Sequence, residues 1–282
     1  MSLSIASIQL CSQTDIDANL DTIKKAVSQA ANQAQLIILP ENACVMGRQD
    51  KLADRFDEMV AFMGNLAKTH HIYLVAGTLP CPTRPDGTDV LGDRFRQVSL
   101  VFNPQGKQIA RYDKIHLFRA TVDDSTGGYD ENNTFEAGDT PVVVPLNIDG
   151  QIIHLGLMIC FDVRFPRLAQ TLRNMGADII SMPAAFTYQT GKTHWQTLLQ
   201  ARALDSQCLI IGSTQGGTHH IGERTRQTWG HAMMVNANGQ IIATTNNTQC
   251  TDDFAIIYAD FDKAAQKSIR QTMPIFECFQ EF

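Results

Sequence analysis

Short apolar runs alternate with longer amphipathic stretches along the chain. Apolar runs typical of buried strands occur in its first part at residues 3–10, 36–40, 72–78 and 98–103. Stretches with apolar side chains at helical spacing lie at residues 19–32 and 51–70. Later in the chain, strands are predicted at residues 152–160, 177–182, 208–214 and 231–236, and helices at residues 165–175 and 193–204. Alternating strands and helices predict an α/β fold.

The two series of elements share short sequences in the same order. Three pairs of segments correspond: residues 8–11 with 157–160, residues 34–40 with 177–183, and residues 103–110 with 236–243. Common turn chemistry can produce such matches by chance, but the shared order favours two similar halves, at about residues 1–117 and 150–260. Two sheets packed face to face, each with an outer helix layer, would form a four-layer α-β-β-α sandwich.

Two segments lie outside these halves. Residues 118–140 are rich in Gly, Asp, Asn and Thr, which predicts a long loop of the kind that is usually functional or disordered. The tail, residues 261–282, has helical character up to Arg270. It ends with apolar side chains that we expect to dock on another surface: Ile275, Phe276, Phe279 and Phe282. We predict that residues 1–282 form a single domain.

Composition narrows the classes of function. A net charge of −6 disfavours binding to nucleic acid or to an anionic membrane surface. No apolar run approaches the ~20 residues that a membrane helix needs, and the first residues lack the basic region of a signal peptide. Seven cysteines without a CxxC pair favour a reducing compartment, and we expect a cytoplasmic protein. Adjacent histidines (His70 and His71, His219 and His220) cannot both face one metal from a regular element, so we predict no metal and no other cofactor.

Three reactive side chains lie where apolar runs end or just after them. Cys160 closes the strand predicted at residues 152–160 and precedes an Asp, an Arg and a Pro turn, where open α/β sheets usually hold their chemistry. Glu41 follows the run at residues 36–40, and Lys114 lies in a mixed run near the end of the first half. Taken separately, a packing cysteine, a turn carboxylate and a solvated lysine are the commoner roles.

Together, the three motifs resemble those of the nitrilase superfamily of carbon–nitrogen hydrolases. Leu-Pro-Glu41-Asn, Tyr-Asp-Lys114-Ile-His and Cys160-Phe-Asp-Val-Arg-Phe-Pro occur in the order and at about the spacing of that family's Glu-Lys-Cys triad. The resemblance runs over nearly the whole chain and implies the same α-β-β-α sandwich. It also implies a second carboxylate in the central loop. Glu131 holds the matching place, and Glu136 is the competing choice.

The resemblance further implies a mechanism. Cys160 would form a thioester with an amide substrate, Glu41 would act as general base, and Lys114 with the backbone N–H of Phe161 would hold the oxyanion. Phe161 replaces the family's usual Tyr, which removes a hydroxyl but keeps the backbone donor. Arg167 replaces a common Glu and affects the ion pairing at the start of the next helix. The intact triad argues against the non-enzyme alternative, a catalytically inactive binding scaffold.

The surrounding residues are most similar to the branch that hydrolyses deaminated glutathione. The ω-amidase branch commonly has Asn in place of Thr187, and N-carbamoyl amidases and nitrilases share the triad, so these remain alternatives. Deaminated glutathione and ω-amides of oxo-acids carry carboxylates, for which Arg164 is the candidate cation; its alternative role is an ion pair with Asp162. Thr187 would donate a hydrogen bond, and Phe186 would form a pocket wall. The family also implies a homodimer or a larger homo-oligomer.

Overall fold

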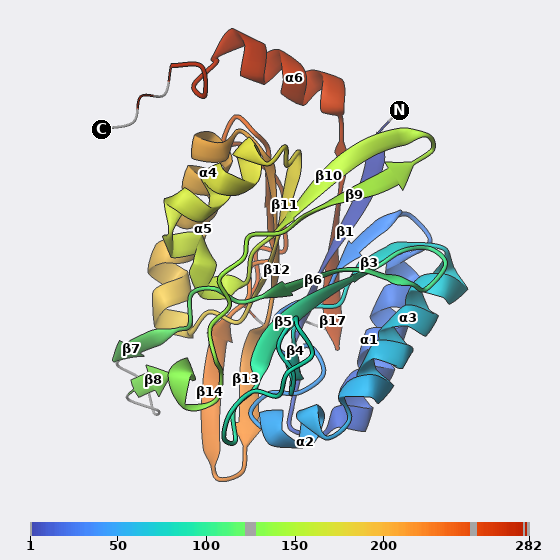
Figure 1. The fold of residues 1–282 in the computed structure, drawn as a ribbon, viewed down its shortest axis with the longest axis vertical. Coiled ribbons are helices and arrows are strands. Elements are labelled where there is room, and N and C mark those ends of the chain that lie inside the picture. The colour runs from blue at the N-terminus through green and yellow to red at the C-terminus, as the bar shows by residue number, and fades with distance from the viewer. Residues whose placement is uncertain (1, 122–127, 249–252, 279, 281–282) are drawn as a thin grey trace.

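The computed structural model describes residues 2–121, 128–248, 253–278 and 280. Within them, the first large sheet has seven strands in the order β17-β1-β2-β3-β5-β4, with β6 also paired to β5 (Figure 1). Its strands are β1 (Leu3–Leu10), β2 (Leu36–Ile38), β3 (Tyr73–Val75), β4 (Leu79–Cys81), β5 (Arg96–Phe102), β6 (Gln108–Asp113) and β17 (Phe254–Phe261).

The second large sheet has six described strands in the order β16-β15-β12-β11-β10-β9. Its strands are β9 (Val143–Ile148), β10 (Gln151–Leu157), β11 (Ile179–Ala184), β12 (Leu209–Thr214), β15 (Met233–Val235) and β16 (Ile241–Thr244). A separate hairpin, β13 (Gly216–Ile221) with β14 (Arg224–Trp229), follows β12 in the chain.

The two sheets repeat one topology. In each, three parallel strands are followed by two antiparallel ones: β1, β2, β3, β5 and β6 in the first, β10, β11, β12, β15 and β16 in the second. An antiparallel strand flanks each first strand, β17 beside β1 and β9 beside β10. Even the register shift recurs, between Val101 and Phe102 and between Met234 and Val235. The similarity expected from the sequence is therefore present in the fold.

Helices cover the outer face of each sheet. Side chains of α1 (Ile16–Ala30) and α3 (Phe56–His70) share an apolar cluster with one face of the first sheet. Its other face shares a cluster with the second sheet and with α4 (Pro166–Asn174) and α5 (Tyr188–Ser206). In Figure 1 the two helix pairs lie on opposite sides of the molecule. The predicted α-β-β-α sandwich is confirmed.

Two buried serines join the sheets where they face each other. The Ser7 hydroxyl on β1 donates to the Gly212 carbonyl on β12 at 2.9 Å. The Ser213 hydroxyl lies within hydrogen-bond distance of the carbonyl oxygens of Ile8 and Ile38. Because an unpaired buried hydroxyl is costly, these bonds fix how the sheets are placed against each other.

Several element boundaries differ from the sequence prediction. The helix expected at residues 51–70 is two helices, α2 (Gln49–Ala53) and α3, because the chain leaves helical geometry at Arg55, whose guanidinium binds Asp17 and Glu58. The strand expected at residues 152–160 ends at Leu157.

The ends of the two halves also differ from expectation. β17 lies late in the chain but joins the first sheet, and β9 precedes residue 150 but joins the second. The expected loop at residues 118–140 contains β7 (Arg119–Thr121), β8 (Gly128–Asp130) and the 3₁₀-helix η1 (Glu131–Asn133), while residues 122–127 lie outside the described residues.

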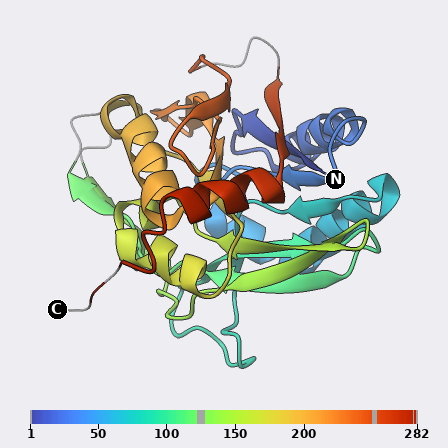
Figure 2. The same ribbon diagram turned by 90° about the horizontal axis from the view of Figure 1, so that it is seen from above.

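The tail crosses from the first sheet to the second. After β17, helix α6 (Lys263–Thr272) lies across one end of the molecule (Figure 2). Beyond it, the ring of Phe276 lies under the Arg173 guanidinium at 5.0 Å. The other tail phenylalanines, Phe279 and Phe282, lie outside the described residues.

Candidate active site

Cys160 is held in a backbone conformation that side-chain-bearing residues rarely adopt. It is the first residue of the 3₁₀-helix η2 (Cys160–Arg164) and has a φ of 46°. A non-glycine residue in this left-handed region costs free energy of order 1–3 kcal/mol, and such residues cluster at functional sites. The residue itself is 8% exposed. The thiol is thus held just beyond the end of β10, not on the strand.

The Asp162 carboxylate holds this turn. One oxygen accepts from the backbone N–H of Ile159 at 2.9 Å and from the Tyr112 hydroxyl at 2.7 Å. The other accepts from the backbone N–H of His116 at 3.0 Å and lies 2.7 Å from the Nδ1 of the same residue. Asp162 is fully buried. Its bonds tie η2 to the chain that follows β6.

Glu41, Lys114 and Glu131 form one buried ionic cluster. Lys114 Nζ lies 2.8 Å from Glu41 Oε1, and 3.0 Å and 2.9 Å from the two carboxylate oxygens of Glu131. Neither Lys114 nor Glu41 has more than 3% of its side chain exposed. Glu131 also accepts from the backbone N–H of Phe118 at 2.7 Å, and Glu41 accepts from the Gln97 amide at 3.2 Å. The cluster gathers side chains from after β2, after β6 and from η1.

Burial and charge set the ionisation of this cluster. Burial disfavours the Lys114 ammonium, but the carboxylates of Glu131 and Glu41 outweigh that effect and raise the pKa of Lys114. Burial raises the pKa of Glu131, while Lys114 opposes that shift. For the Cys160 thiol, burial and then Glu41 raise the pKa well above its ordinary value, and Lys114 lowers it. The Cys160 thiol and the Glu41 carboxylate line the same pocket.

The competing carboxylate, Glu136, belongs to a different cluster. Its Oε1 lies 2.7 Å from Arg84 Nε, and it also pairs with Arg96. The hydrogen bond from Arg84 is the largest of the effects that lower the pKa of Glu136 to about 2. Of the two candidates for the central-loop carboxylate, the structure therefore places Glu131 on Lys114.

The sequence of this chain is similar to those of known proteins. Residues 4–271 match the family model described as carbon-nitrogen hydrolase. The chain belongs to the carbon–nitrogen hydrolase family. It is 34% identical over 279 residues to a deaminated glutathione amidase of Yersinia enterocolitica, across 97% of this chain and 92% of that protein.

Two solved structures share the fold of this carbon–nitrogen hydrolase. The Caenorhabditis elegans NitFhit protein has a TM-score of 0.83 at 30% identity, covering 99% of this chain and 65% of that one. Saccharomyces cerevisiae Nit3, a member of branch 10 of the nitrilase superfamily, has a TM-score of 0.79 at 27% identity, covering 97% and 95% of the two chains.

Glu41, Glu131 and Cys160 line a small pocket of the hydrolase. Its volume is about 30 Å³, which gives room for about two water molecules. Phe161, Phe186 and Arg164, the candidate substrate-binding residues, also line it. The free volume next to the thiol is thus small.

Arg164 does not pair with Asp162, the alternative partner considered from the sequence. Its guanidinium lies over the rings of Phe161 and Phe186, at 5.6 Å and 5.3 Å from their centroids, and both Nη atoms lie 3.3 Å from His194 Nδ1. No salt bridge to Arg164 is present in the part of the chain that the structure describes. Its charge therefore faces the pocket without a counter-charge.

Thr187 lies outside the pocket wall. It is 2% exposed, begins α5, and its hydroxyl lies 2.8 Å from the hydroxyl of Thr190. Thr190, one helical turn later, lines the pocket instead. The expected substrate contact of Thr187 is therefore not seen in the pocket lining, and its hydroxyl reaches the pocket only through that of Thr190.

Arg226 is a pocket residue that the sequence did not indicate. It lies on β14 and lines the same pocket as Cys160. A lone arginine in a polar strand gives no signal in the sequence. It reaches the pocket because the β13–β14 hairpin contacts α5 and the residues that follow β1, and these tertiary contacts cannot be read from the sequence.

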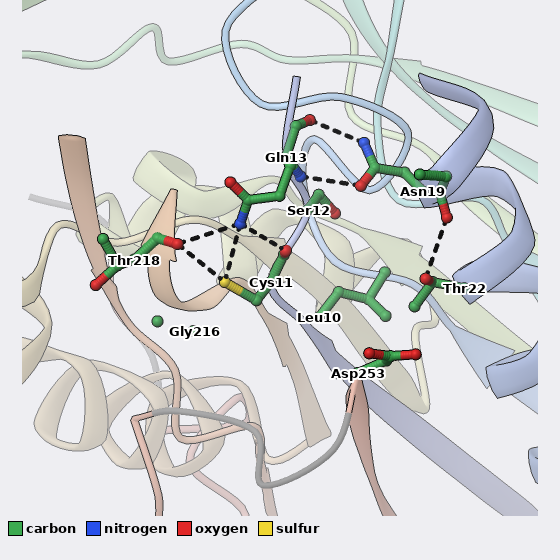
Figure 3. Close-up of a pocket in the computed structure, with 11 residues that line it drawn as sticks. Leu10, Cys11, Ser12, Gln13, Asn19, Thr22, Gly216, Thr218 and Asp253 are labelled. Carbon is green, nitrogen blue, oxygen red and sulfur yellow. Dashed lines mark hydrogen bonds between the residues drawn. The ribbon is translucent and has the colours of Figure 1, made fainter. Parts of the chain in front are cut away.

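The equivalent strand end in the first half supplies an internal comparison. Cys11 follows β1 and lines a larger pocket of about 390 Å³, shown in Figure 3. Its thiol lies 3.4 Å from the Thr218 carbonyl and 3.5 Å from the Gln13 amide. His219 Nδ1 is 4.0 Å away but is engaged by the Ser12 carbonyl at 2.7 Å. None of these described partners is a carboxylate or an ammonium, so Cys11 lacks the setting of Cys160.

In residues 2–121, 128–248, 253–278 and 280, no group of three or more His, Cys, Asp and Glu side chains could hold a metal ion. Across the same residues, no helix is long and apolar enough to cross a membrane.

Proposed function

We propose that the protein hydrolyses a linear carboxamide through a thioester on Cys160, with Glu41 as general base and Lys114 as oxyanion donor. The observation that carries this proposal is the position of Glu41, which binds the Lys114 ammonium at 2.8 Å and lines the same pocket as Cys160. A nucleophile and a base at one pocket, with a cation bound to the base, meet the needs of acyl transfer.

Attack on the amide begins with proton transfer. Because the pKa of Cys160 is raised, the resting group is a thiol, and its proton passes to Glu41 as the sulfur attacks the carbonyl carbon. The left-handed turn at Cys160 sets the sulfur beyond the strand end, beside the pocket.

Lys114 would stabilise the oxyanion together with the backbone N–H of Phe161. An ammonium has three N–H donors, and Glu41 takes one of them. One forked N–H can serve both oxygens of Glu131, which leaves the third donor for substrate oxygen. Removing one such donor costs roughly 10²–10³ in kcat in other acyl-transfer enzymes.

The remaining steps return the enzyme to its starting state. Glu41 gives its proton to the leaving nitrogen as the C–N bond breaks, which releases ammonia or an amine and leaves the thioester. Water then loses a proton to Glu41 and attacks the thioester carbon. The C–S bond breaks, and the thiolate takes the proton back from Glu41.

For the substrate, we propose an amide that carries carboxylates, with deaminated glutathione as the leading candidate. Arg164 supports this choice, because its guanidinium lines the pocket with aromatic and histidine contacts in place of a carboxylate partner. The similarity to deaminated glutathione amidases over nearly the full chain favours the same substrate.

We also propose a cytoplasmic homo-oligomer built from one domain over residues 1–282. Met175, which follows α4, and Leu204, in the last turn of α5, are large apolar side chains that are 49% and 52% exposed, and they would be covered by pairing across these helices. Sedimentation of the wild type beside Leu204→Asp tests this, and a monomeric wild type would contradict it.

The proposed function is tested by substituting Cys160. Cys160→Ala is expected to lose at least about 10³-fold in kcat on deaminated glutathione while keeping its thermal midpoint, because only the nucleophile is removed. Cys11→Ala, the matched thiol of the first half, should keep wild-type kcat. The panel includes 2-oxoglutaramate, an N-carbamoyl amino acid and a nitrile. Wild-type turnover by Cys160→Ala would refute the thioester mechanism, and preference for another panel member would refute the substrate.

A further inference from the structure

Arg226 brings a second positive charge to the pocket. Its Nη2 donates to the Ala185 carbonyl at 2.9 Å, and its guanidinium lies 5.1 Å from the Tyr129 ring centroid. Nη1 has only the Met46 sulfur at 3.9 Å, and the buried Nε has no hydrogen-bond partner. Within the described ranges, no carboxylate lies within salt-bridge distance of Arg226.

The charges of the pocket do not balance. Glu41 and Glu131 are both engaged by Lys114, so they are not available to neutralise an arginine. Arg164 and Arg226 both line the pocket, and neither has a described carboxylate partner. A partly buried guanidinium with unused donors is costly unless an anion completes it, and its planar fork suits a carboxylate.

The two arginines reach the pocket from different elements of the fold. Arg164 belongs to η2, the same short helix as Cys160. Arg226 belongs to β14 and donates to the carbonyl of Ala185, another residue that lines the pocket. The acyl part of the substrate becomes bonded to the Cys160 sulfur in η2, which favours Arg164 for the acyl part. Arg226, on β14, is then available for the amine part.

We propose that Arg226 binds a carboxylate on the amine side of the scissile amide, while Arg164 binds the carboxylate on the acyl side. The enzyme then selects a peptide-like amide with a carboxylate at each end over a primary amide that releases ammonia. This inference rests on the proposed function and names the substrate class of the same site. Arg226 becomes a specificity-determining residue.

The test uses three substrates with one acyl group, 2-oxoglutaryl, and different amines. The amine is ammonia in the first, a dipeptide with a free terminal carboxylate in the second, and the same dipeptide with a terminal amide in the third. Wild type should prefer the second at least tenfold in kcat/KM over the third. Arg226→Met should lose at least ten times more kcat/KM on the second substrate than on the other two, mainly through KM.

Two control variants separate binding from a structural role. Arg224→Met removes an exposed arginine two residues earlier on the same strand and should leave all three substrates unchanged. Arg226→Lys keeps the charge and should retain part of the preference. Arg164→Met should weaken all three substrates, because all carry the acyl-side carboxylate.

Two results would overturn the inference. One is an equal loss on all three substrates in Arg226→Met, which would mean that Arg226 only positions Ala185. The other is a wild type that does not distinguish the free carboxylate from the terminal amide. Failure of the proposed function looks different, since the wild type would then cleave none of the three or would cleave them without Cys160.

Discussion

The Asp162 carboxylate holds the turn at Cys160 in place, a role that its position near the nucleophile in the sequence did not indicate. Asp162→Ala leaves the buried donors of Tyr112, His116 and Ile159 unpaired. We expect a loss of about 3 kcal/mol in the free energy of unfolding and a fall in kcat, because the turn at Cys160 loses its support. Tyr112→Phe removes one of these bonds and should cost only about 1 kcal/mol. Denaturant unfolding of both variants checks this, and equal losses would contradict it.

Glu131 is expected to control the alkaline limit of activity. The carboxylates of Glu131 and Glu41 raise the pKa of Lys114 against burial, so removing one of them lowers that pKa. In Glu131→Gln the ammonium therefore loses its proton at lower pH, and the alkaline limb of the kcat profile moves to lower pH. We also expect kcat to fall about 10–100-fold at neutral pH as oxyanion stabilisation weakens.

The control for this prediction is the neighbouring carboxylate. Glu136→Gln breaks the contacts to Arg84 and Arg96 but none to Lys114, so its pH profile should match the wild type. A profile between pH 6 and 10 that shifts in Glu136→Gln and not in Glu131→Gln would mean that the two roles are exchanged.

At the residue scale, motif order predicted Glu41, Lys114, Glu131 and Cys160 as neighbours, and the structure brings them together. Neighbour relations that depend on three-dimensional packing were not predictable. Thr187 and Thr190 lie one helical turn apart, and only Thr190 lines the pocket. Arg226 reaches the pocket through a hairpin that no hydrophobic periodicity marks.

At the element scale, the β13–β14 hairpin is attached to the first sheet through a buried histidine. His219 Nδ1 lies 2.7 Å from the Ser12 carbonyl after β1, and Nε2 lies 2.6 Å from the Thr228 hydroxyl. These contacts fit a neutral ring that donates through Nδ1 and accepts through Nε2. Burial lowers the pKa of His219 to about 4.

This histidine should make the fold sensitive to acid. Between pH 6.5 and 4 the unfolded chain binds a proton at His219 that the folded chain does not, so stability falls as pH falls. The loss from pH 7 to 4.5 is about 2 kcal/mol for this group. His219→Gln should be less stable at pH 7 but lose about 2 kcal/mol less than the wild type over this range. Urea unfolding at pH 7 and pH 4.5 measures these losses. If the wild type and His219→Gln lost the same free energy of unfolding between the two pH values, the assignment would be contradicted.

Most strands and helices of the two halves were predictable because their apolar periodicity is strong. The failures have physical causes. The chain leaves helical geometry at Arg55 inside a continuous helical pattern, and no local signal shows this break. β17 was not predicted, since its place beside β1 depends on pairing between the two ends of the described chain.

At the scale of the whole molecule, Asp178 connects the C-terminal helix to the second sheet. Its carboxylate lies 2.8 Å from Lys263 Nζ and 3.6 Å from Arg270 Nη1, and it accepts from the backbone N–H of His154 at 3.0 Å. The side chain is 4% exposed. These bonds hold α6 at the start of β10 and β11.

Asp178→Ala should loosen this attachment. We expect the free energy of unfolding to fall by about 3 kcal/mol, because two cations and a backbone donor lose their partner. Lys267→Ala changes an exposed residue of the same helix and should have little effect. Thermal unfolding of both variants, with proteolysis to locate α6 release, checks this. Similar midpoints for Asp178→Ala and the wild type would contradict it.

The four-layer arrangement followed from the internal repeat, which made a two-sheet sandwich the simplest way to bury both halves. The repeat could not predict how the two ends of the chain close the structure. β17 and α6 lie outside the segments that repeat in the sequence. Their positions depend on partners that are distant in sequence, β1 for β17 and Asp178 for α6.

The pairing of β1 with β17 has a consequence for the order of folding. β1 leaves the ribosome well before its antiparallel partner β17, with which it pairs over all eight of its residues. Until β17 emerges, the apolar β1 presents an open hydrogen-bonding edge. The first sheet thus cannot close before β17 has been synthesised, and until then the edge of β1 is a site for edge-to-edge aggregation.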